Sequence, residues 1–281
     1  MRLSGLCCLF LLLLSSCNIK GKPIKRVDNS IISLLPSLTE TVCALGLSDH
    51  LIGVSSFCIY PKEVVDSLPR VGDCINPNVE QILTMKPSIV LLGDMQTEAE
   101  DKLRGLKIPV IKFNQSRISD VYDAFHVLGK MYNVERKANS IVMGLKTSLD
   151  SIHSVNSGRP LKRVLFVVGR TPGSLSNIYS INCRSFLAEL LHAAGGASVF
   201  DSMPLVWCKV SLEEIIIRNP EYIIETALMG NSDDASEIWR SLPGIEAVKK
   251  NHVYTLQEEY VFTPGPRMVE TAAKLSQLLG Q

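Results

Sequence analysis

A pattern that predicts a short helix followed by a strand occurs twice in this chain of 281 residues. The first copy runs from Asn78 to Leu91 and the second from Ser211 to Ile224. Each begins with a side chain that can cap a helix, has a Glu two residues later, and continues with apolar residues at helical spacing. In each, a proline ends the helix before an apolar run typical of a strand. Two copies with the same cap, acid and proline predict two lobes of similar construction.

Predicted strands and helices alternate on both sides of the first copy. Apolar runs at 31–35, 51–54, 89–92 and 110–113 predict strands, and helices are predicted between them. Strands separated by helices of this length pair in parallel through βαβ units. We therefore expect a Rossmann-like N-terminal lobe over residues 31–118.

The same order restarts in the second half of the chain. Strands are predicted at 164–168 and 198–200, with a helix between them, and an irregular loop that carries Trp207 is predicted at 201–210. We expect a second lobe over residues 157–281. The predicted fold class is α/β, with two Rossmann-like lobes that have parallel central sheets.

The segment at 119–156 has helical spacing but no strand signals, which predicts two helices. The second would extend over about twenty residues, or roughly 30 Å at the rise of an α-helix. That length is enough to connect two lobes. A surface helix packed on one lobe is the alternative, but similar patterns on both sides favour a connecting helix.

The first sixteen residues differ from the rest of the chain. Arg2 precedes an apolar run at 9–14 that is too short to cross a bilayer, which indicates an export signal at residues 1–16. The following Leu-Ser-Ser-Cys resembles a bacterial lipobox, in which Cys17 carries lipid after cleavage. An ordinary signal peptide with an incidental Cys17 is the alternative. Residues 17–30 are polar and lack periodicity, so we expect a tether to the membrane.

Net charge gives no indication of nucleic-acid binding. The full chain has a formal net charge of +1, and loss of Arg2 with the signal would bring it to zero. A neutral chain is not attracted to polyanions or to an anionic membrane face.

Cysteine and histidine spacing predicts no metal site. There is no Cys-x-x-Cys, and the five histidines are scattered. Because the number of cysteines after Cys17 is odd, at least one is free or paired elsewhere. Pairing stays open, with Cys58–Cys74 and Cys183–Cys208 as possibilities. These five cysteines are Cys43, Cys58, Cys74, Cys183 and Cys208.

No local motif indicates catalysis. The chain lacks the glycine-rich nucleotide fingerprints, the Gly-x-Ser-x-Gly turn and the HExxH helix. A catalytic set assembled from distant residues remains the alternative to a binding protein.

Ligands of two-lobed α/β proteins lie between the lobes, against loops at the carboxyl ends of strands. Three of these loops carry aromatic residues, four in all, that can stack on a large, partly apolar ligand. Each could instead fill the core of its lobe, although the irregular loop around Trp207 favours the cleft for that residue. The predicted ligand-binding residues are Ser37, Phe57, Tyr60, Cys74, Asp94, Arg170, Trp207 and Tyr260.

Glu80 and Glu213 occupy equivalent positions in the two copies of the helix. A carboxylate in a first helical turn is stabilised by the helix dipole, by about 0.3–1 kcal/mol. That effect explains one Glu at a time. Placement in both lobes also suits a partner with two-fold symmetry that presents arginines.

Several motifs together resemble the helical-backbone, or class III, substrate-binding proteins of ABC importers for cobalamin, haem and ferric siderophores. The similarity covers about residues 27–280 and is strongest to the cobalamin-binding members. It implies two lobes on one long helix, little hinge motion, and delivery of ligand to a permease dimer. The motifs are Ile32–Glu40, Leu51–Phe57, Tyr60–Pro61, Leu68–Gly72, Asn78–Ile82, Lys86–Pro87 and Pro264–Arg267.

The resemblance also implies roles for single residues. Glu80 and Glu213 match the family's docking glutamates, which pair with permease arginines. Phe57 and Trp207 match aromatic cleft positions of the cobalamin-binding members. Cys74 departs from the pattern, because the best-known cobalamin binder has a Trp there, and this leaves the ligand open.

Two other ligands fit the resemblance. Haem-binding members use a Tyr or His on the iron, and siderophore binders use arginines. Tyr60, Tyr260, Arg170 and Arg267 keep both possibilities open.

The combined prediction is a monomeric, lipid-anchored periplasmic protein that captures a corrinoid between its lobes and delivers it to an ABC permease in the inner membrane. No resident cofactor is expected. The alternatives are the same role for haem or a ferric siderophore, a capture lipoprotein that serves no ABC permease, and an exported enzyme. Which membrane holds the lipid is left open.

Overall fold

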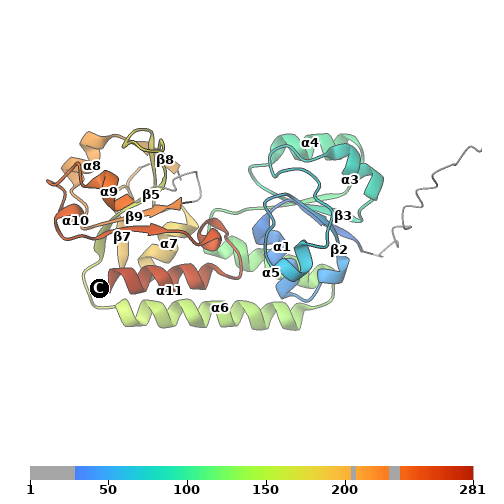
Figure 1. The fold of residues 1–281 in the computed structure, drawn as a ribbon. Coiled ribbons are helices and arrows are strands. Elements are labelled where there is room, and N and C mark those ends of the chain that lie inside the picture. The colour runs from blue at the N-terminus through green and yellow to red at the C-terminus, as the bar shows by residue number, and fades with distance from the viewer. Residues whose placement is uncertain (1–28, 204–206, 228–234, 281) are drawn as a thin grey trace, which may run out of the picture.

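The computed structural model describes residues 29–203, 207–227 and 235–280. The predicted signal peptide, the lipidation residue Cys17 and most of the predicted tether lie outside the described residues. The described chain folds into two α/β lobes connected by one long helix, which confirms the predicted fold class (Figure 1).

The N-terminal lobe is built on a four-stranded parallel sheet with the order β2-β1-β3-β4. Most of its strand residues are buried, as expected where helices cover a parallel sheet. The strands are β1 (Ile31–Ser33), β2 (Leu51–Val54), β3 (Ile89–Gly93) and β4 (Val110–Phe113). The helices are α1 (Pro36–Ala44), η1 (Ser48–His50), α2 (Lys62–Val65), α3 (Val79–Met85) and α4 (Thr97–Gly105).

The C-terminal lobe has a six-stranded sheet that is parallel at its centre and antiparallel at one edge. The main order is β10-β9-β5-β6-β8, and β7 also pairs with β5. The parallel strands are β5 (Lys162–Gly169), β7 (Gly196–Ser198), β9 (Tyr222–Thr226) and β10 (Val253–Leu256), and the antiparallel strands are β6 (Ile178–Ile181) and β8 (Trp207–Val210). The helices are α7 (Phe186–Ala193), α8 (Leu212–Arg218), α9 (Ala235–Trp239), α10 (Glu246–Lys249), η3 (Glu259–Phe262) and α11 (Met268–Leu279).

The edge strand β8 corrects one sequence prediction. An irregular loop was expected over 201–210, but residues 207–210 pair with β6 in an antiparallel arrangement. The strand has four residues, which is too short for an alternating pattern to stand out in the sequence. Trp207 is therefore held by a sheet edge and not by a free loop.

The connecting helix α6 (Glu135–Asn156) runs beneath both lobes in Figure 1. It packs against α5 (Ile118–Met131), α7 and α11. Its buried residues lie on one face, and one hydrophobic core extends through these helices from the N-terminal lobe to the C-terminal lobe. The buried residues of α6 are Ala138, Val142, Leu145 and Leu149. None of the described helices is both long and apolar enough to span a membrane.

Two ion pairs also join the lobes. Arg267, just before α11, binds Glu40 of α1 with 2.7 Å between Nη2 and Oε1. Arg117, at the start of α5, pairs with Glu189 of α7, and the same carboxylate accepts the backbone N–H of Ile118 at 2.7 Å. Each pair connects a residue of the N-terminal half to one of the C-terminal half, so charge contacts as well as the shared core join the lobes.

Candidate functional site

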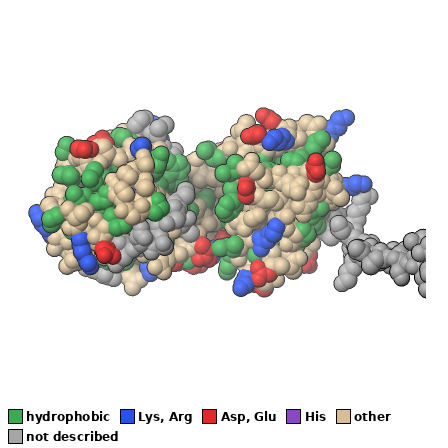
Figure 2. Space-filling model, turned by 45° about the horizontal axis from the view of Figure 1, so that its top comes forward, with side chains coloured by type: hydrophobic (Ala, Val, Ile, Leu, Met, Phe, Trp, Pro, Cys, Tyr) green, Lys and Arg blue, Asp and Glu red, His purple; other side chains and the backbone are tan. Residues whose placement is uncertain are grey.

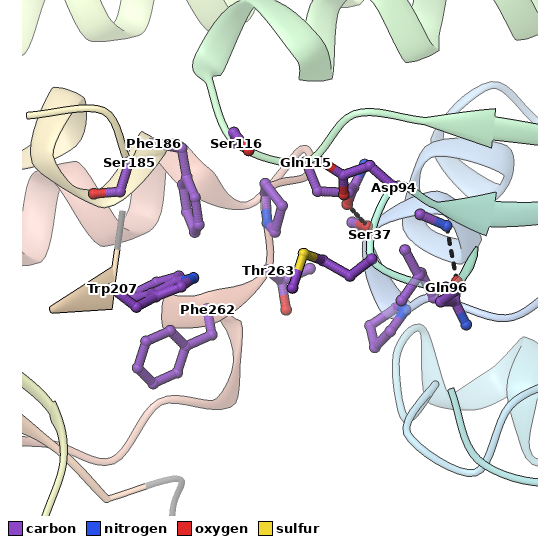
Figure 3. A pocket seen from close by; sticks show the side chains of 15 residues that line it. Ser37, Asp94, Gln96, Gln115, Ser116, Ser185, Phe186, Trp207, Phe262 and Thr263 are labelled. Carbon is purple, nitrogen blue, oxygen red and sulfur yellow. Dashed lines mark hydrogen bonds between the residues drawn. The ribbon is translucent and has the colours of Figure 1, made fainter. Parts of the chain in front are cut away.

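A cavity of about 520 Å³ opens between the two lobes (Figure 3). Its walls are mostly apolar, with a few amide, hydroxyl and carboxylate groups. From the N-terminal half it is lined by Leu35, Pro36, Ser37, Gly93, Asp94, Met95, Gln96, Gln115 and Ser116, and from the C-terminal half by Ser185, Phe186, Trp207, Phe262, Thr263 and Pro264.

The N-terminal wall is formed by segments that follow β1, β3 and β4. These strands are parallel, so their carboxyl ends meet at one edge of the sheet, where ligands of α/β proteins bind. Ser37 donates a hydrogen bond to Gln115 Oε1 across this edge. Gln96 accepts the N–H of Gly93 at 2.8 Å and donates to the carbonyl of Cys74. These contacts hold the polar groups of the wall in place.

The C-terminal wall is aromatic. The rings of Trp207, at the start of β8, and Phe262, at the end of η3, meet edge to face with centroids 6.1 Å apart. Phe186, at the start of α7, also lines this wall (Figure 3). Trp207 is 41 % exposed, so much of its ring is free to contact a ligand. A wall of this kind suits the flat, apolar face of a large ligand.

Asp94 is the one ionisable side chain in the lining formed by the described residues. No Arg, Lys, His or Tyr belongs to that lining. The segments 204–206 and 228–234, outside the described residues, contain none of these four residue types either. The lining therefore lacks a cation to neutralise an anionic ligand, and it lacks the phenol or imidazole that commonly binds haem iron.

Three of the predicted ligand-binding residues line the cavity, namely Ser37, Asp94 and Trp207. Phe57 and Tyr60 are exposed but lie outside the lining. Phe57 belongs to a loop bound to the next loop through Ser56 N–H and the carbonyl of Gly72, 2.8 Å apart.

Cys74 belongs to that next loop, and its carbonyl accepts from Gln96 of the lining. The thiol of Cys74 is only partly buried, and burial raises its pKa. The loops that carry Phe57 and Cys74 thus adjoin the cavity wall without forming it.

Tyr60 and Tyr260 both contact the side chain of Arg267. The guanidinium of Arg267 lies over both rings, 4.0 Å from the centroid of Tyr60 and 5.1 Å from that of Tyr260. The guanidinium thus makes two cation–π contacts in addition to its ion pair with Glu40.

Arg170 does not reach the cavity, which corrects its prediction as a ligand-binding residue. Its side chain is 0 % exposed and its Nε lies 3.0 Å from the buried carboxylate of Glu225. Trp239 Nε1 donates to the same carboxylate at 2.7 Å. Arg170 is a structural residue in the core of the C-terminal lobe.

Several lining residues were not predicted from the sequence. Gln96 and Gln115 follow strands β3 and β4, so the rule that selected Asp94 could also have selected them. Phe262 lies in the loop from which only Tyr260 was chosen. The turn of η3 directs Phe262 to the cavity and Tyr260 to Arg267.

Glu80 and Glu213 lie on α3 and α8, on the side of the molecule away from α6 (Figure 1). The two helices have the same local construction. Asn78 Oδ1 accepts the N–H of Gln81 at 3.0 Å, and Ser211 Oγ accepts that of Glu214 at 3.1 Å.

Both helices end at a residue in the left-handed region, Lys86 with φ 49° and Asn219 with φ 45°. Both docking candidates are exposed. The repeated sequence pattern thus corresponds to a repeated structure, one copy on each lobe.

The five cysteines of the described residues are all unpaired, so neither possible disulfide is formed. Among the described residues no cluster of three or more His, Cys, Asp or Glu side chains is arranged to hold a metal ion.

Comparisons of this chain with known proteins agree on one family. The sequence profile of the family described as "Periplasmic binding protein" matches residues 31–260. An uncharacterized ABC transporter substrate-binding lipoprotein of Bacillus subtilis is 31 % identical, over 90 % of this chain and 81 % of its own length. A vitamin B12-binding protein of Vibrio vulnificus is 27 % identical, over 92 % of this chain and 90 % of its own length.

A solved structure shows the same architecture. A possible iron-binding, periplasmic solute-binding protein from Staphylococcus epidermidis superposes with a TM-score of 0.79 at 29 % identity. The match covers 90 % of this chain and 99 % of that protein.

Proposed function

The chain belongs to the periplasmic binding protein family, and from this premise we propose that it is the lipid-anchored substrate-binding protein of an ABC importer whose ligand is a corrinoid. Its relatives are substrate-binding proteins and not enzymes, so the alternative of an exported enzyme is set aside. The observation that carries the ligand assignment is the chemistry of the cavity lining.

A corrinoid matches that lining. Its ring is large and apolar on its faces, its edge carries neutral amides, and its cobalt enters with its own ligands. The faces can lie against Trp207 and Phe262, and the amides can exchange hydrogen bonds with Gln96, Gln115 and the carboxylate of Asp94. No cation is needed, and no protein group has to bind the metal.

Haem and anionic ferric siderophores match the lining less well. Haem carries two carboxylates and usually takes an iron ligand from the protein, and many siderophore complexes are anions. Three arginines that the fold brings toward the interior of the protein or to the junction of the lobes are already paired with carboxylates. These pairs are Arg170–Glu225, Arg267–Glu40 and Arg117–Glu189.

The size of the cavity indicates that neighbouring loops take part. A corrinoid is larger than 520 Å³, so part of it must extend beyond the lining. Phe57, Ile59 and Ile75 are 55 %, 53 % and 73 % exposed. Hydrogen bonds of Gly72 and Cys74 connect their loops to the wall, which supports the proposal that the rest of the ligand lies against this apolar surface.

The anchor and the partner complete the proposal. The Leu-Ser-Ser-Cys sequence supports a lipid on Cys17, in keeping with a relative that is itself named a lipoprotein. Glu80 and Glu213, one exposed carboxylate on each lobe, support docking to a permease dimer in the membrane. We place the mature protein outside the cytoplasm, as a monomer held at a membrane surface.

Calorimetry with four ligands tests the ligand assignment. Mature protein without its signal is titrated with cyanocobalamin, dicyanocobinamide, haemin and an anionic ferric catecholate. We expect heat of binding with the two corrinoids and little with the other two. Tight binding of haemin or of the ferric complex, without binding of either corrinoid, would transfer the same transport role to that ligand.

A further inference from the structure

The two docking helices, α3 and α8, have the same order of exposed and buried positions. The second helical residue is an exposed Glu in each, Glu80 or Glu213, and the fourth is a fully buried Ile, Ile82 or Ile215. The next residue in α3 is Leu83, which is 44 % exposed. Its counterpart in α8 is Ile216, which is 48 % exposed.

Each exposed aliphatic residue is three positions after its Glu, so the two side chains are neighbours on the helix surface. The same pair, a carboxylate beside an aliphatic group, is therefore presented by both lobes. A single exposed apolar residue needs no explanation. An exposed aliphatic residue at the equivalent position of both lobes does need an explanation, because the sequences of the two helices differ at most positions.

Helix stability does not account for these residues. α8 contains three consecutive isoleucines, and β-branched residues are weaker helix formers than Ala, Lys or Glu. Ile215 is buried, but Ile217 is 81 % exposed and packs little against its own lobe. An exposed position of this kind would be served better by a polar residue unless something covers it.

The carboxylates are available to a partner. Among the described residues, neither Glu80 nor Glu213 forms an ion pair. In α8 the capping interaction with Ser211 is made by Glu214, which leaves Glu213 free. Figure 2 brings forward the side that holds α3 and α8, and hydrophobic side chains are exposed there on both lobes, with acidic side chains among them.

We propose that Leu83, Ile216 and Ile217 form the apolar part of the docking surface. The partner this surface fits is a two-fold symmetric membrane permease that offers, on each half, a cation for the Glu and an apolar patch for the aliphatic residue beside it. This inference rests on the proposed function, since it assumes docking through Glu80 and Glu213.

The carboxylates and the aliphatic side chains would contribute differently to docking, because ion pairs and apolar contacts respond differently to salt. Exposed ion pairs contribute little each and are weakened by salt. Burial of aliphatic surface is insensitive to moderate salt and scales with the area covered. The carboxylates would therefore guide and orient the encounter, and the aliphatic side chains would supply the part of the affinity that persists at high salt.

Binding to the permease at several salt concentrations tests the inference. Ligand-loaded protein is bound to nanodiscs that contain the cognate permease–ATPase complex, and to nanodiscs that contain lipid alone. The variants are Leu83→Ser with Ile216→Ser and Ile217→Ser, and Glu80→Gln with Glu213→Gln. The matched control, Met143→Ser with Val155→Ser, removes exposed apolar residues from α6 on the far side of the molecule.

We expect the aliphatic variant to bind about tenfold more weakly at every salt concentration, with the salt dependence of the wild type. The glutamine variant should bind more weakly at low salt and lose most of its salt dependence. The control should match the wild type. If the triple substitution lowers the melting temperature, Leu83→Ala and Ile216→Ala are measured singly, with a smaller loss expected from each.

Two outcomes overturn this inference and leave the docking proposal intact. In one, the aliphatic variants bind the permease as tightly as the wild type does, while binding of the glutamine variant loses its salt dependence. The other is an equal loss of binding to lipid-only nanodiscs, which would make the aliphatic surface a lipid contact. If the glutamine variant also binds as the wild type does, the proposed docking through Glu80 and Glu213 fails as well.

Discussion

Glu40 and Arg267 form a two-point ion pair between the lobes. Arg267 Nη2 lies 2.7 Å from Glu40 Oε1, and Arg267 Nε donates to Oε2 at 3.0 Å. The Glu40 side chain is 1 % exposed and that of Arg267 is 11 % exposed. A buried charge is strongly destabilising when its partner is absent. Because the partners of this pair come from different lobes, the stability of each lobe depends on the other.

We expect Arg267→Met to lower the free energy of unfolding by about 3 kcal/mol at neutral pH, because it leaves the carboxylate of Glu40 buried without a partner. The same change removes the cation that contacts the rings of Tyr60 and Tyr260. Urea denaturation measures the loss. Glu259→Gln is the matched control, because Glu259 binds the same guanidinium but is 45 % exposed, and it should cost about 1 kcal/mol or less. Equal losses would show that burial of the pair is unimportant.

The stability of Arg267→Met should also depend on pH. Burial raises the pKa of Glu40, and the hydrogen bond and charge of Arg267 oppose that rise. Without Arg267 the pKa of Glu40 should rise further. A carboxyl whose pKa is raised in the folded state stabilises the protein below its unfolded pKa, and this stability is lost as the pH rises through the folded pKa.

The deficit of the variant relative to the wild type should therefore shrink as the pH falls from 7 toward the unfolded pKa of a Glu, about 4.3. Denaturation midpoints across that range measure the change. A deficit that stays constant with pH would show that Glu40 is not the charge left unpaired.

The sequence was sufficient to predict the two lobes, because the long helix α6 and the buried strands have clear periodicity. It was not sufficient for the antiparallel edge of the C-terminal sheet. β6 and β8 have four residues each, and pairing between residues 178–181 and 207–210 is a long-range contact that no local pattern records. The short strands and the mixed character of that sheet were missed for this reason.

The site was predictable only in part. The ends of parallel strands indicate which segments line a cleft, and this rule selected Ser37, Asp94 and Trp207. The rule cannot tell which way a side chain points. Arg170 follows β5 as expected, but Glu225, on the adjacent strand β9, holds it in the core.

Trp207→Ala should weaken corrinoid binding about tenfold to a hundredfold, because it removes the indole from the aromatic C-terminal wall and leaves Phe262 without its edge-to-face partner. Calorimetry with cyanocobalamin measures the effect. Trp207→Phe should restore much of the affinity. Tyr179→Ala, which removes an aromatic of similar exposure from the neighbouring strand β6 but outside the lining, should leave it unchanged. Equal affinity of Trp207→Ala and the wild type would remove Trp207 from the binding surface.

Glu80→Ala with Glu213→Ala should separate capture from delivery. Both side chains are exposed and lie on α3 and α8, outside the cavity lining, so the affinity for cyanocobalamin should be that of the wild type. Uptake of labelled cyanocobalamin by cells that depend on this protein should fall by about tenfold or more, since each lobe loses its charge contact with the permease.

The neighbouring substitution Gln81→Ala with Glu214→Ala is the control for local helix damage. It changes the next residue of both helices, including the Glu that caps α8, and leaves the docking carboxylates in place. Uptake should be reduced much less by this control than by loss of Glu80 and Glu213. If the docking variant transports as the wild type does, the protein hands its ligand over by another surface or serves no ABC permease, which is the capture role that the sequence left open.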